Sequence, residues 1–493
     1  MRVGLFTEGT YPVADGGVTR WCDLLVRSLP EHTFVPVTII GHDERPTVST
    51  PGNVAEPTLI PMWSPTRATF LPRRRGLLED LLEQVWSAAL PPGAEDSDVP
   101  GFARALQGLT TWPGSRLSGM LAGRGSARAL LAAWRAHRLT RPDLPPLTLA
   151  CAVQATAHVD RVLALADARF PDVDLCHVAA NGPSAVLALG RRWSSGTPIL
   201  LTEHGIYLRE RYLALAGTDL SRGARRAVTS FLRVLSQTAY AEAALLTPVS
   251  DFNARWEESL GAESARIRTI HNGVDTGRFQ VIRTEPHHPT VSFVGRIDPL
   301  KDLATLIAAM AIVREQVPEA QLRIFGPVPD GNEPYRDTLT DLIDQQGLGS
   351  HVTFEGPVSS AVPALEAGHV IALSSISEGL PYTVIEAMMC GRATVSTDVG
   401  GVSEVVGADG SCGLLVPPRN PAAMAAALVR VLTDEKSRED MGTRARGRAL
   451  QMFDLELFAT RYREAYAEAA GSEPPSWLAP PPEPSDATTE VAL

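Results

Sequence analysis

Two glutamates eight residues apart mark the stretch SEGLPYTVIEAMMCG, residues 377–391. The second, Glu386, falls among apolar residues of an expected buried helix. Burying a carboxylate there costs several kcal/mol unless hydrogen-bond donors surround it, and the paired hydroxyls of a ribose are such donors. The alternative is a helix glutamate partly exposed to solvent. The first glutamate, Glu378, stands at the expected strand end, where it can accept hydrogen bonds from a polyol.

The residues between the two glutamates predict a site for an anion or a hydroxyl group. Pro381 suits the first position of a helix, and the loop before it contains Gly379. Free backbone N–H groups and the positive end of the helix dipole favour negative charge at such a terminus.

A second stretch, FVGRIDPLKD, places two cations after an expected buried strand. Arg296 and Lys301 stand five residues apart, across a turn set by Pro299. A guanidinium can bind two phosphate oxygens and an ammonium group neutralises charge, so the pair fits a diphosphate. The alternative is a solvated basic pair in front of a helix.

A third loop, ADGGVTR, contains Gly16 and Gly17. Glycines here allow the backbone to approach a ligand closely, and the alternative is a plain tight turn. The GxGxxG fingerprint of dinucleotide enzymes is absent from this loop, which argues against a dehydrogenase.

A fourth loop, LLTEHGIYLRER, is dense in polar residues directly after an apolar run. His204 is a candidate for contact with the reacting group of a substrate, although a single histidine is more often structural. The neighbouring candidates for an acceptor-binding wall are Glu203, Tyr207, Arg209 and Glu210.

These loops need strands and helices to position them, and the chain begins with the right alternation. RVGLFTEG and TFVPVTIIG predict two strands with a helix between them, which is typical of a doubly wound α/β domain. The rhythm is interrupted from about 64 to 150 by arginine-, alanine- and leucine-rich stretches, which predict a helical insertion. It resumes and ends in RIRTIHNGVD, residues 266–275, the expected last strand of this domain.

A second α/β domain follows the expected linker TEPHHP, residues 284–289. Its first helix carries apolar residues on one face, namely Leu303, Leu306, Ile307, Met310 and Val313. Ligands bind at the carboxyl ends of strands in such sheets, so we expect the four loops to line a cleft between two facing domains. The expected divisions are 1–285 and 286–455, a helix at 456–472 that packs back on the first domain, and a disordered, proline- and acid-rich tail at 473–493.

Composition excludes several other classes of protein. A chain of 493 residues, with 44% hydrophobic and 20% charged residues, has room for two or three globular domains. A net charge of -11 argues against a nucleic-acid partner. Five scattered cysteines are typical of a reduced, cytoplasmic protein. The sequence contains no run of about 18 uncharged apolar residues, which is the pattern of a membrane span. We therefore expect any membrane association to be peripheral or through a partner.

Taken together, these stretches resemble the retaining nucleotide-sugar glycosyltransferases of family 4, which have the two-domain GT-B fold. The matching stretches are the Glu378/Glu386 pair, GRIDPLK, HNGVD, GGVSEVV and GLLVPPRNP. EGTYPVADGGVTRW and TEHGIYLRER are similar to the Pel exopolysaccharide branch of that family. The resemblance implies a cytoplasmic hexosyltransferase that moves a sugar, with UDP-glucose or a related UDP-sugar as donor, to a glycan or small-molecule acceptor.

The resemblance also assigns roles to residues. It implies that Arg296 and Lys301 bind the donor diphosphate and that Glu386 binds the ribose. Glu378 and the backbone of Gly379, Leu380, Pro381, Tyr382 and Thr383 would contact the donor sugar and phosphate. Gly16 and Gly17 would approach the diphosphate from the other domain, and His204 would stand beside the transferred sugar.

In this family the two cations replace a metal ion, so the resemblance implies that the reaction needs no metal cofactor. The Asp-x-Asp of residues 172–174 precedes an expected strand, so it is not placed to chelate a metal at a strand end. Two alternatives remain open on the sequence: a nucleotide-sugar epimerase or hydrolase on the same fold, and a non-catalytic subunit that binds nucleotide or carbohydrate.

Overall fold

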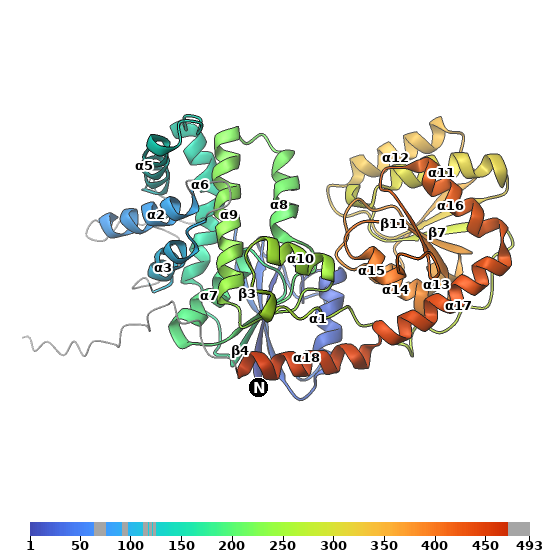
Figure 1. Ribbon diagram of the computed structural model, residues 1–493, viewed down its shortest axis with the longest axis horizontal. Helices are drawn as coiled ribbons and strands as arrows, with labels where there is room; N and C mark the ends of the chain where they lie inside the picture. Colours follow the sequence, from blue (N-terminus) through green and yellow to red (C-terminus); the bar gives the residue numbers. More distant parts are fainter. Residues whose placement is uncertain (64–74, 91–96, 112–116, 118–120, 122–124, 472–493) are drawn as a thin grey trace, which may run out of the picture. The chain divides into compact units, whose positions relative to one another are not determined.

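The computed structural model describes residues 1–63, 75–90, 97–111, 117, 121 and 125–471 (Figure 1). Contacts divide the chain into two units. The first contains Met1–Thr247, Trp256–Arg268 and the chain from Glu464 onward, and the second contains Pro248–Arg255 and Thr269–Arg463. The tail expected at 473–493 lies outside the described residues.

The first unit is built on a parallel sheet with strand order β3-β2-β1-β4-β5-β6. This 3-2-1-4-5-6 order is that of a doubly wound sheet, and it confirms the predicted doubly wound α/β domain. The short third strand was not expected. The strands are β1 (Arg2–Glu8), β2 (Thr33–Ile40), β3 (Thr58–Pro61), β4 (Leu175–Val178), β5 (Ile199–Leu201) and β6 (Leu245–Leu246).

The helices of this unit follow the strands and bury one face each. In α1, Trp21, Cys22 and Leu25 lie on the buried face. The helices that accompany the sheet are α1 (Gly17–Ser28), α7 (Pro183–Ser195), α8 (Tyr207–Ala216) and α9 (Arg222–Glu242). The next helix, α10 (Asp251–Ser259), is divided between the two units.

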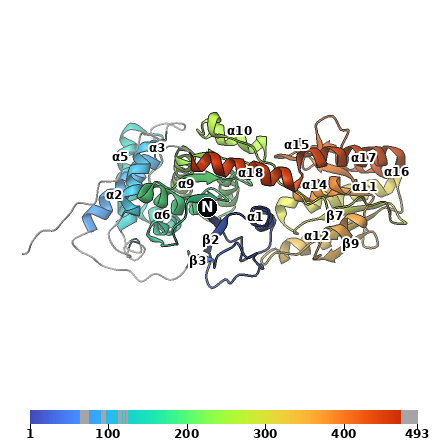
Figure 2. The ribbon, with the colours of Figure 1, turned by 90° about the horizontal axis from the view of Figure 1, so that it is seen from below.

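The insertion is helical, as expected, and it packs on α9 (Figures 1 and 2). Trp86 and Phe102 from the insertion contact Phe231 of α9, with ring centroids 5.9 and 5.5 Å apart. The insertion therefore shares the hydrophobic core of the first unit. Its described helices are α2 (Arg75–Ala89), α3 (Val99–Thr110), α5 (Gly125–Thr140) and α6 (Leu149–Ala164).

One strand prediction is wrong. Residues 266–275 form two isolated bridges, Ile267 with Leu246 and Val274 with Asp454, and no strand in place of the expected last strand of the first sheet. Strand β6 is two residues long and offers little edge for pairing. N of Arg268 donates to the carbonyl of Leu246, and from Thr269 onward the chain belongs to the second unit.

The second unit repeats the architecture, with strand order β12-β11-β10-β7-β8-β9. Numbered within the unit and read from the β9 edge, this order is again 3-2-1-4-5-6. The strands are β7 (Thr290–Val294), β8 (Gln321–Phe325), β9 (Val352–Gly356), β10 (Val370–Leu373), β11 (Ala393–Thr397) and β12 (Leu414–Val416).

Both faces of this second sheet are covered by helices. Alternate residues of β10 point to opposite faces, so Val370 and Ala372 join one buried cluster while Ile371 and Leu373 join the other. The five apolar residues expected on one face of α11 are all buried. The helices are α11 (Leu303–Gln316), α12 (Glu333–Gln345), α13 (Val362–Glu366), α14 (Tyr382–Met389), α15 (Val402–Val406), α16 (Pro421–Thr433) and α17 (Glu435–Met452).

The last described helix, α18 (Leu455–Ala470), starts in the second unit and ends in the first. Near its end, the hydroxyl of Tyr466 lies 2.8 Å from Nδ1 of His177 in strand β4. Burial lowers the pKa of His177 to about 3, so this histidine is neutral at pH 7.

Among the described helices, the segment Leu149–Asp167 is long and apolar enough to cross a membrane by length and composition alone. Its mean hydropathy is 1.2, and 44% of it is buried inside the protein. Core helices pass the same test, so the observation is weak evidence for a span.

Candidate functional site

The strongest group of candidate residues lies in the second unit, after two neighbouring strands. Arg296 and Lys301 follow β7, and Glu378 follows β10. These strands pair in parallel at the point where the strand order changes direction. The crevice outside the carboxyl ends of strands at such a switch point is the usual ligand site of a doubly wound sheet.

Lys301 and Glu378 form an ion pair. Nζ of Lys301 lies 2.6 Å from Oε1 of Glu378, and the hydroxyl of Ser375 donates to the same oxygen at 2.5 Å. The two side chains are 21% and 11% exposed. Lys301 is therefore not a solvated basic residue, and the structure brings together two residues that are 77 positions apart in the sequence.

Lysine is rare in this chain, and residue 301 is one of its lysines. Lysine occurs at Lys301 and Lys436, whereas lysine and arginine together number 45. The chain uses arginine for nearly every other positive charge. A lysine here supplies a compact, rotatable ammonium in place of the planar guanidinium of arginine.

Arg296 differs from Lys301 in its surroundings. It is exposed, and its guanidinium makes no hydrogen bond or ion pair within the described ranges. The backbone around it is fixed, because N of Gly295 donates to the carbonyl of Phe325 and N of Ile297 donates to the carbonyl of Pro327, each at 2.9 Å. The guanidinium is thus exposed on a hydrogen-bonded backbone and accessible to a ligand.

Backbone contacts hold the two loops against each other. N of Ile376 donates to the carbonyl of Leu300 at 2.9 Å, and the hydroxyl of Ser374 donates to the carbonyl of Lys301 at 2.7 Å. These bonds fix the distance between the lysine loop and the glutamate loop without using either charged side chain. These backbone contacts between the two loops therefore position the ion pair.

Two glycines of the stretch GGVSEVV support the glutamate loop from behind. A Cβ atom at Gly400, whose φ is +59°, would lie 1.7 Å from the carbonyl oxygen of Glu378. N of Gly401 donates to the carbonyl of Gly379 at 2.9 Å. Both positions need glycine because the loop packs directly on their backbone.

The amide of Asn272 adds a third support, since its Nδ2 donates to the carbonyl of Leu380 at 2.8 Å. Asn272 belongs to HNGVD, one of the stretches that carried the family resemblance. The supporting roles of Ser375, Gly400 and Gly401 were not predicted. The signal that could have shown them is the Gly-Gly pair at the end of β11.

Glu386 is 2% exposed, which rules out the alternative of a partly exposed helix residue. It lies on α14, one turn after the helix start. Pro381 precedes α14 as its N-cap, one position earlier than expected, and it has no side chain able to cap the helix. In the described chain the backbone N–H groups of Gly379, Leu380 and Thr383 donate no hydrogen bond, so they are available to an anion.

Thr383 faces back toward the first strand of this sheet. Its hydroxyl donates to the carbonyl of Val294 at 3.1 Å, at the end of β7. Leu380 is buried, while Gly379 and Tyr382 are half-buried. The five residues from 379 to 383 thus form one rigid turn between the ion pair and the buried glutamate.

The remaining candidates lie in the first unit, at the carboxyl ends of its strands. Gly16 is the N-cap of α1 and Gly17 its first residue, and both are exposed. A Cβ at either position would meet nothing within 4 Å, so packing does not demand glycine there. Contacts within the protein therefore do not explain why glycine occupies these two positions.

His204 follows β5 and packs edge-on against Trp21, with ring centroids 4.6 Å apart. Burial lowers its pKa to about 3, so the imidazole is neutral at pH 7. Its Nε2 has no hydrogen-bond partner among the described residues. A neutral imidazole with a vacant nitrogen can donate to or accept from a hydroxyl group of a ligand.

Glu203 points into the protein, away from any surface wall. It is 1% exposed and accepts a hydrogen bond from the hydroxyl of Tyr240 at 3.0 Å. Burial raises its pKa to about 8, and the nearby Glu210 adds to the rise. Glu257, fully buried on α10, was not predicted; burial and the charge of Glu203 raise its pKa well above the usual range.

The other residues of that loop begin α8. The ring of Tyr207 packs on Gly182, where a Cβ would lie 2.4 Å from it. Arg209 is half-buried and Glu210 exposed in the first turn of the helix. The loop after β5 therefore exposes Glu210 and part of Arg209, whereas Nε2 of His204 and the carboxylate of Glu203 are buried.

Two doubly wound parallel sheets in one chain, each with polar loops at the carboxyl ends of its strands, define the GT-B class of fold. The chain belongs to the family described as "Domain of unknown function (DUF3492)", whose model matches residues 1–265. Residues 278–448 match the family "Glycosyl transferases group 1", so the second unit carries a glycosyltransferase domain.

Curated relatives agree with this placement. The D-inositol 3-phosphate glycosyltransferase of Nocardia farcinica is 35% identical over 202 residues, which are 38% of this chain and 44% of the relative. The phosphatidyl-myo-inositol mannosyltransferase of Mycolicibacterium smegmatis is 31% identical over 234 residues, which are 45% of this chain and 57% of the relative. The chain thus spans about half the length of these two relatives.

Among solved structures, the Anabaena protein HepE in complex with UDP has the same fold. Its TM-score is 0.60 at 16% identity, and the match covers 95% of this chain and all of HepE. HepE has also been solved with UDP-glucose. At this identity the match shows the fold alone, and it confirms the predicted GT-B architecture. The Pel branch, retention and the residue roles stay predictions.

Proposed function

We propose that the protein is a retaining glycosyltransferase that moves a hexose from a nucleotide-sugar to a hydroxyl acceptor, with UDP-glucose or a related UDP-sugar as donor. The observation that carries the proposal is the Lys301–Glu378 ion pair, framed by backbone bonds at the switch point of a sheet, with buried Glu386 one short helix away. The glycosyltransferase domain match and the UDP and UDP-glucose complexes of HepE support it.

In the proposed complex, the diphosphate lies between Arg296 and Lys301. Lys301 exchanges its ion pair with Glu378 for a phosphate oxygen, and Arg296 folds onto the diphosphate from its exposed position. The carboxylate of Glu378 is then available to a hydroxyl of the donor sugar. Glu386 accepts hydrogen bonds from the ribose, and the N–H groups of Gly379, Leu380 and Thr383 bind the phosphate or the sugar.

The proposed reaction breaks the bond between the anomeric carbon and the diphosphate oxygen and forms a bond from that carbon to the acceptor oxygen. The acceptor hydroxyl gives its proton to the departing diphosphate oxygen on the same face, which retains the configuration. Positive charge at Arg296 and Lys301 stabilises the developing negative charge of the leaving group. With two cations in this role, the transfer requires no metal ion.

The first unit contributes the acceptor side in this proposal. Neutral His204, with its vacant Nε2, accepts or donates a hydrogen bond at a hydroxyl of the transferred sugar. Gly16 and Gly17 let the start of α1 approach the diphosphate, because no side chain fills the space above them. Tyr207, Arg209 and Glu210 bind the acceptor, and Glu203 holds the loop that carries them.

The acceptor is a glycan or a small polyol, and exopolysaccharide synthesis in the cytoplasm is the proposed setting. The names of the two relatives, which act on inositol derivatives, support a polyhydroxylated acceptor. The net charge of -11 gives no support to a nucleic-acid partner. Association with a membrane, where it occurs, is peripheral or through a partner protein.

Isothermal titration calorimetry with UDP-glucose, UDP-N-acetylglucosamine, GDP-mannose and ADP-glucose tests the proposal. We expect one UDP-sugar to bind most tightly and Lys301→Met to weaken that binding by about tenfold or more, because a charge-assisted bond is lost. Lys436→Met removes the other, exposed lysine and serves as the matched control. Failure of all four donors to bind the folded protein would refute the proposal.

Product analysis then tests retention. With the donor that binds, NMR of the initial product should show the anomeric configuration of the donor. An inverted product would contradict the same-face reaction, and release of an epimerised nucleotide-sugar would favour the epimerase alternative.

A further inference from the structure

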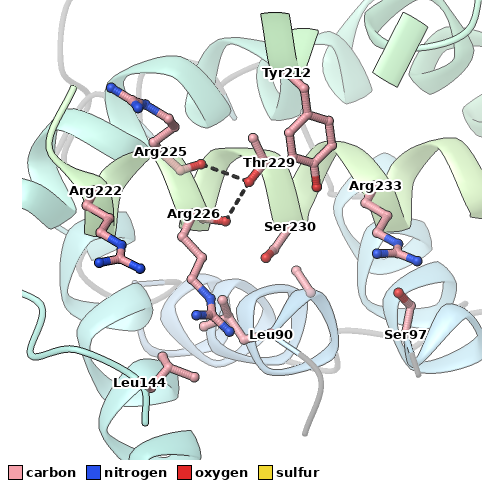
Figure 3. Close-up of a pocket in the computed structure, with 11 residues that line it drawn as sticks. Leu90, Ser97, Leu144, Tyr212, Arg222, Arg225, Arg226, Thr229, Ser230 and Arg233 are labelled. Carbon is pink, nitrogen blue, oxygen red and sulfur yellow. Dashed lines mark hydrogen bonds between the residues drawn. The ribbon is translucent and has the colours of Figure 1, made fainter. Parts of the chain in front are cut away.

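Outside the strand-end loops, the first unit contains a pocket of about 360 Å³ beside helix α9 (Figure 3). It shares no residue with the Lys301–Glu378 site or with the loop after β5. Its lining comes from α9, from Tyr212 of α8 and from the insertion. The lining includes Leu90, Ser97, Leu144, Arg222, Arg226, Ser230 and Arg233.

The pocket is lined by arginines at helical spacing. Arg222, Arg226 and Arg233 are four and seven residues apart, so one face of α9 carries all three. Figure 3 shows Arg222 and Arg226 extending toward the side of Leu90 and Leu144, while Arg233 extends toward Ser97. The hydroxyl of Ser230 lies between Arg226 and Arg233 in the same view.

A fourth arginine, Arg225, has a different task. Its guanidinium donates to the carbonyls of Thr218 and Leu220 at 3.2 and 3.3 Å, so it fixes the turn between α8 and α9. Figure 3 shows it extending away from Arg226. Arg225 keeps its positive charge, but its guanidinium is occupied by this turn, so Arg222, Arg226 and Arg233 are the arginines considered as ligand contacts.

Two of these charges are not neutralised by the protein. Arg222 and Arg226 are exposed, and neither forms an ion pair or a side-chain hydrogen bond in the part of the chain that the structure describes. Arg226 has a weak electrostatic interaction with the carboxylate of Asp143. The guanidinium of Arg141 donates two hydrogen bonds to that carboxylate, at 2.8 and 2.9 Å. Arg141 is the main cause that lowers the pKa of Asp143 to about 2, and Arg226 contributes less.

The start of α9 adds to the positive potential. Arg222 is the first residue of this helix, whose N-cap is Ser221, so the positive end of the helix dipole lies at the pocket. Clustered guanidinium groups, a helix start and nearby hydroxyls together match the charge and the acceptor oxygens of a phosphate group. Leu90 and Leu144 offer an apolar surface beside them.

We propose that this pocket binds the phosphate group of a phosphate ester, with Arg222 and Arg226 as its main contacts. The phosphate is carried either by a small soluble ester or by a lipid headgroup. Both sources share the chemistry that the arginines recognise, and the experiment separates them.

Two binding assays on the full chain, each with saturating UDP to occupy the donor site, test this proposal. The soluble probe is inorganic phosphate, followed by line broadening in phosphorus NMR. The lipid probe is phosphatidylcholine vesicles with and without phosphatidic acid, followed by co-sedimentation. We expect at least one probe to bind, and Arg222→Gln/Arg226→Gln to weaken that binding by about tenfold or more.

The matched control is Arg104→Gln/Arg135→Gln, which removes the same charge from exposed positions on α3 and α5 of the same unit. It should bind like the wild-type chain. A second variant, Ser230→Glu, places a carboxylate beside the arginines and should also weaken binding. Dependence on Arg222 and Arg226 in the phosphate assay assigns a soluble ester, and dependence in the vesicle assay alone assigns a headgroup. Equal binding by the wild type, the double variant and the control, or no binding by the wild type, would overturn the proposal.

Discussion

Gly400→Ala tests whether the backbone frame positions the glutamate loop. The new Cβ would lie 1.7 Å from the carbonyl oxygen of Glu378 and 2.7 Å from its carbonyl carbon, so the loop or the glycine must move by more than 1 Å. Gly400 also has a φ of +59°, which costs a residue with a Cβ about 1–2 kcal/mol. Gly410→Ala is the matched control, because its φ is +72° and its nearest contact is 3.8 Å away.

Both variants should lose about 1–2 kcal/mol of unfolding free energy from the backbone term, as measured by urea denaturation. They should differ in function. A shift of about 1 Å in a positioned catalytic group can lower the rate about a hundredfold, so Gly400→Ala should turn over the donor at least tenfold more slowly. Gly410→Ala should keep the wild-type rate. Equal rates in the two variants would show that the contact between Gly400 and Glu378 does not position the site.

Three further outcomes follow from the same geometry. Glu386→Gln should weaken binding of free UDP about ten- to a hundredfold in calorimetry, whereas Glu378→Gln should leave UDP binding near wild type and lower turnover of the intact donor; wild-type affinity in folded Glu386→Gln would refute the ribose role. Donor turnover should survive EDTA, and a loss that Mn²⁺ or Mg²⁺ restores would contradict the two-cation account. Glu203 has its pKa raised to about 8, so the unfolded chain releases its proton at lower pH than the folded one. Stability should therefore fall as pH rises from about 5 to about 8, and Glu203→Gln should flatten that fall in melting temperature. An unchanged slope would mean that Glu203 does not control it.

The sequence predicted most of the fold because strand and helix periods are local properties. The face of α11 and the strands β1 and β2 follow from spacing and apolar runs alone. Residues 266–275 were mistaken for a strand because their apolar alternation says nothing about whether a sheet edge is available. Strand β6 is two residues long, and no local pattern in 266–275 reveals this.

The site was predictable in its residue types and less so in its contacts. Glu378, Glu386 and Lys301 were chosen for their chemistry, but their burial depends on neighbours that are distant in sequence. The contact between Gly400 and Glu378 is such a case, because both belong to loops whose meeting is decided by strand order. Glu203 is a case in which the prediction failed. As a polar residue at a strand end it was expected in the acceptor-binding wall, but it is buried and accepts a hydrogen bond from Tyr240.

The most direct test of the central claim uses the two lysines of the chain. Acetylation with a limiting reagent, followed by mass spectrometry, measures the reactivity of Lys301 with exposed Lys436 as an internal control. If Lys301 binds the donor diphosphate, saturating UDP-sugar should protect Lys301 about tenfold or more and leave Lys436 unchanged. Equal acetylation of Lys301 with and without donor, under conditions where calorimetry shows the donor bound, would contradict the account.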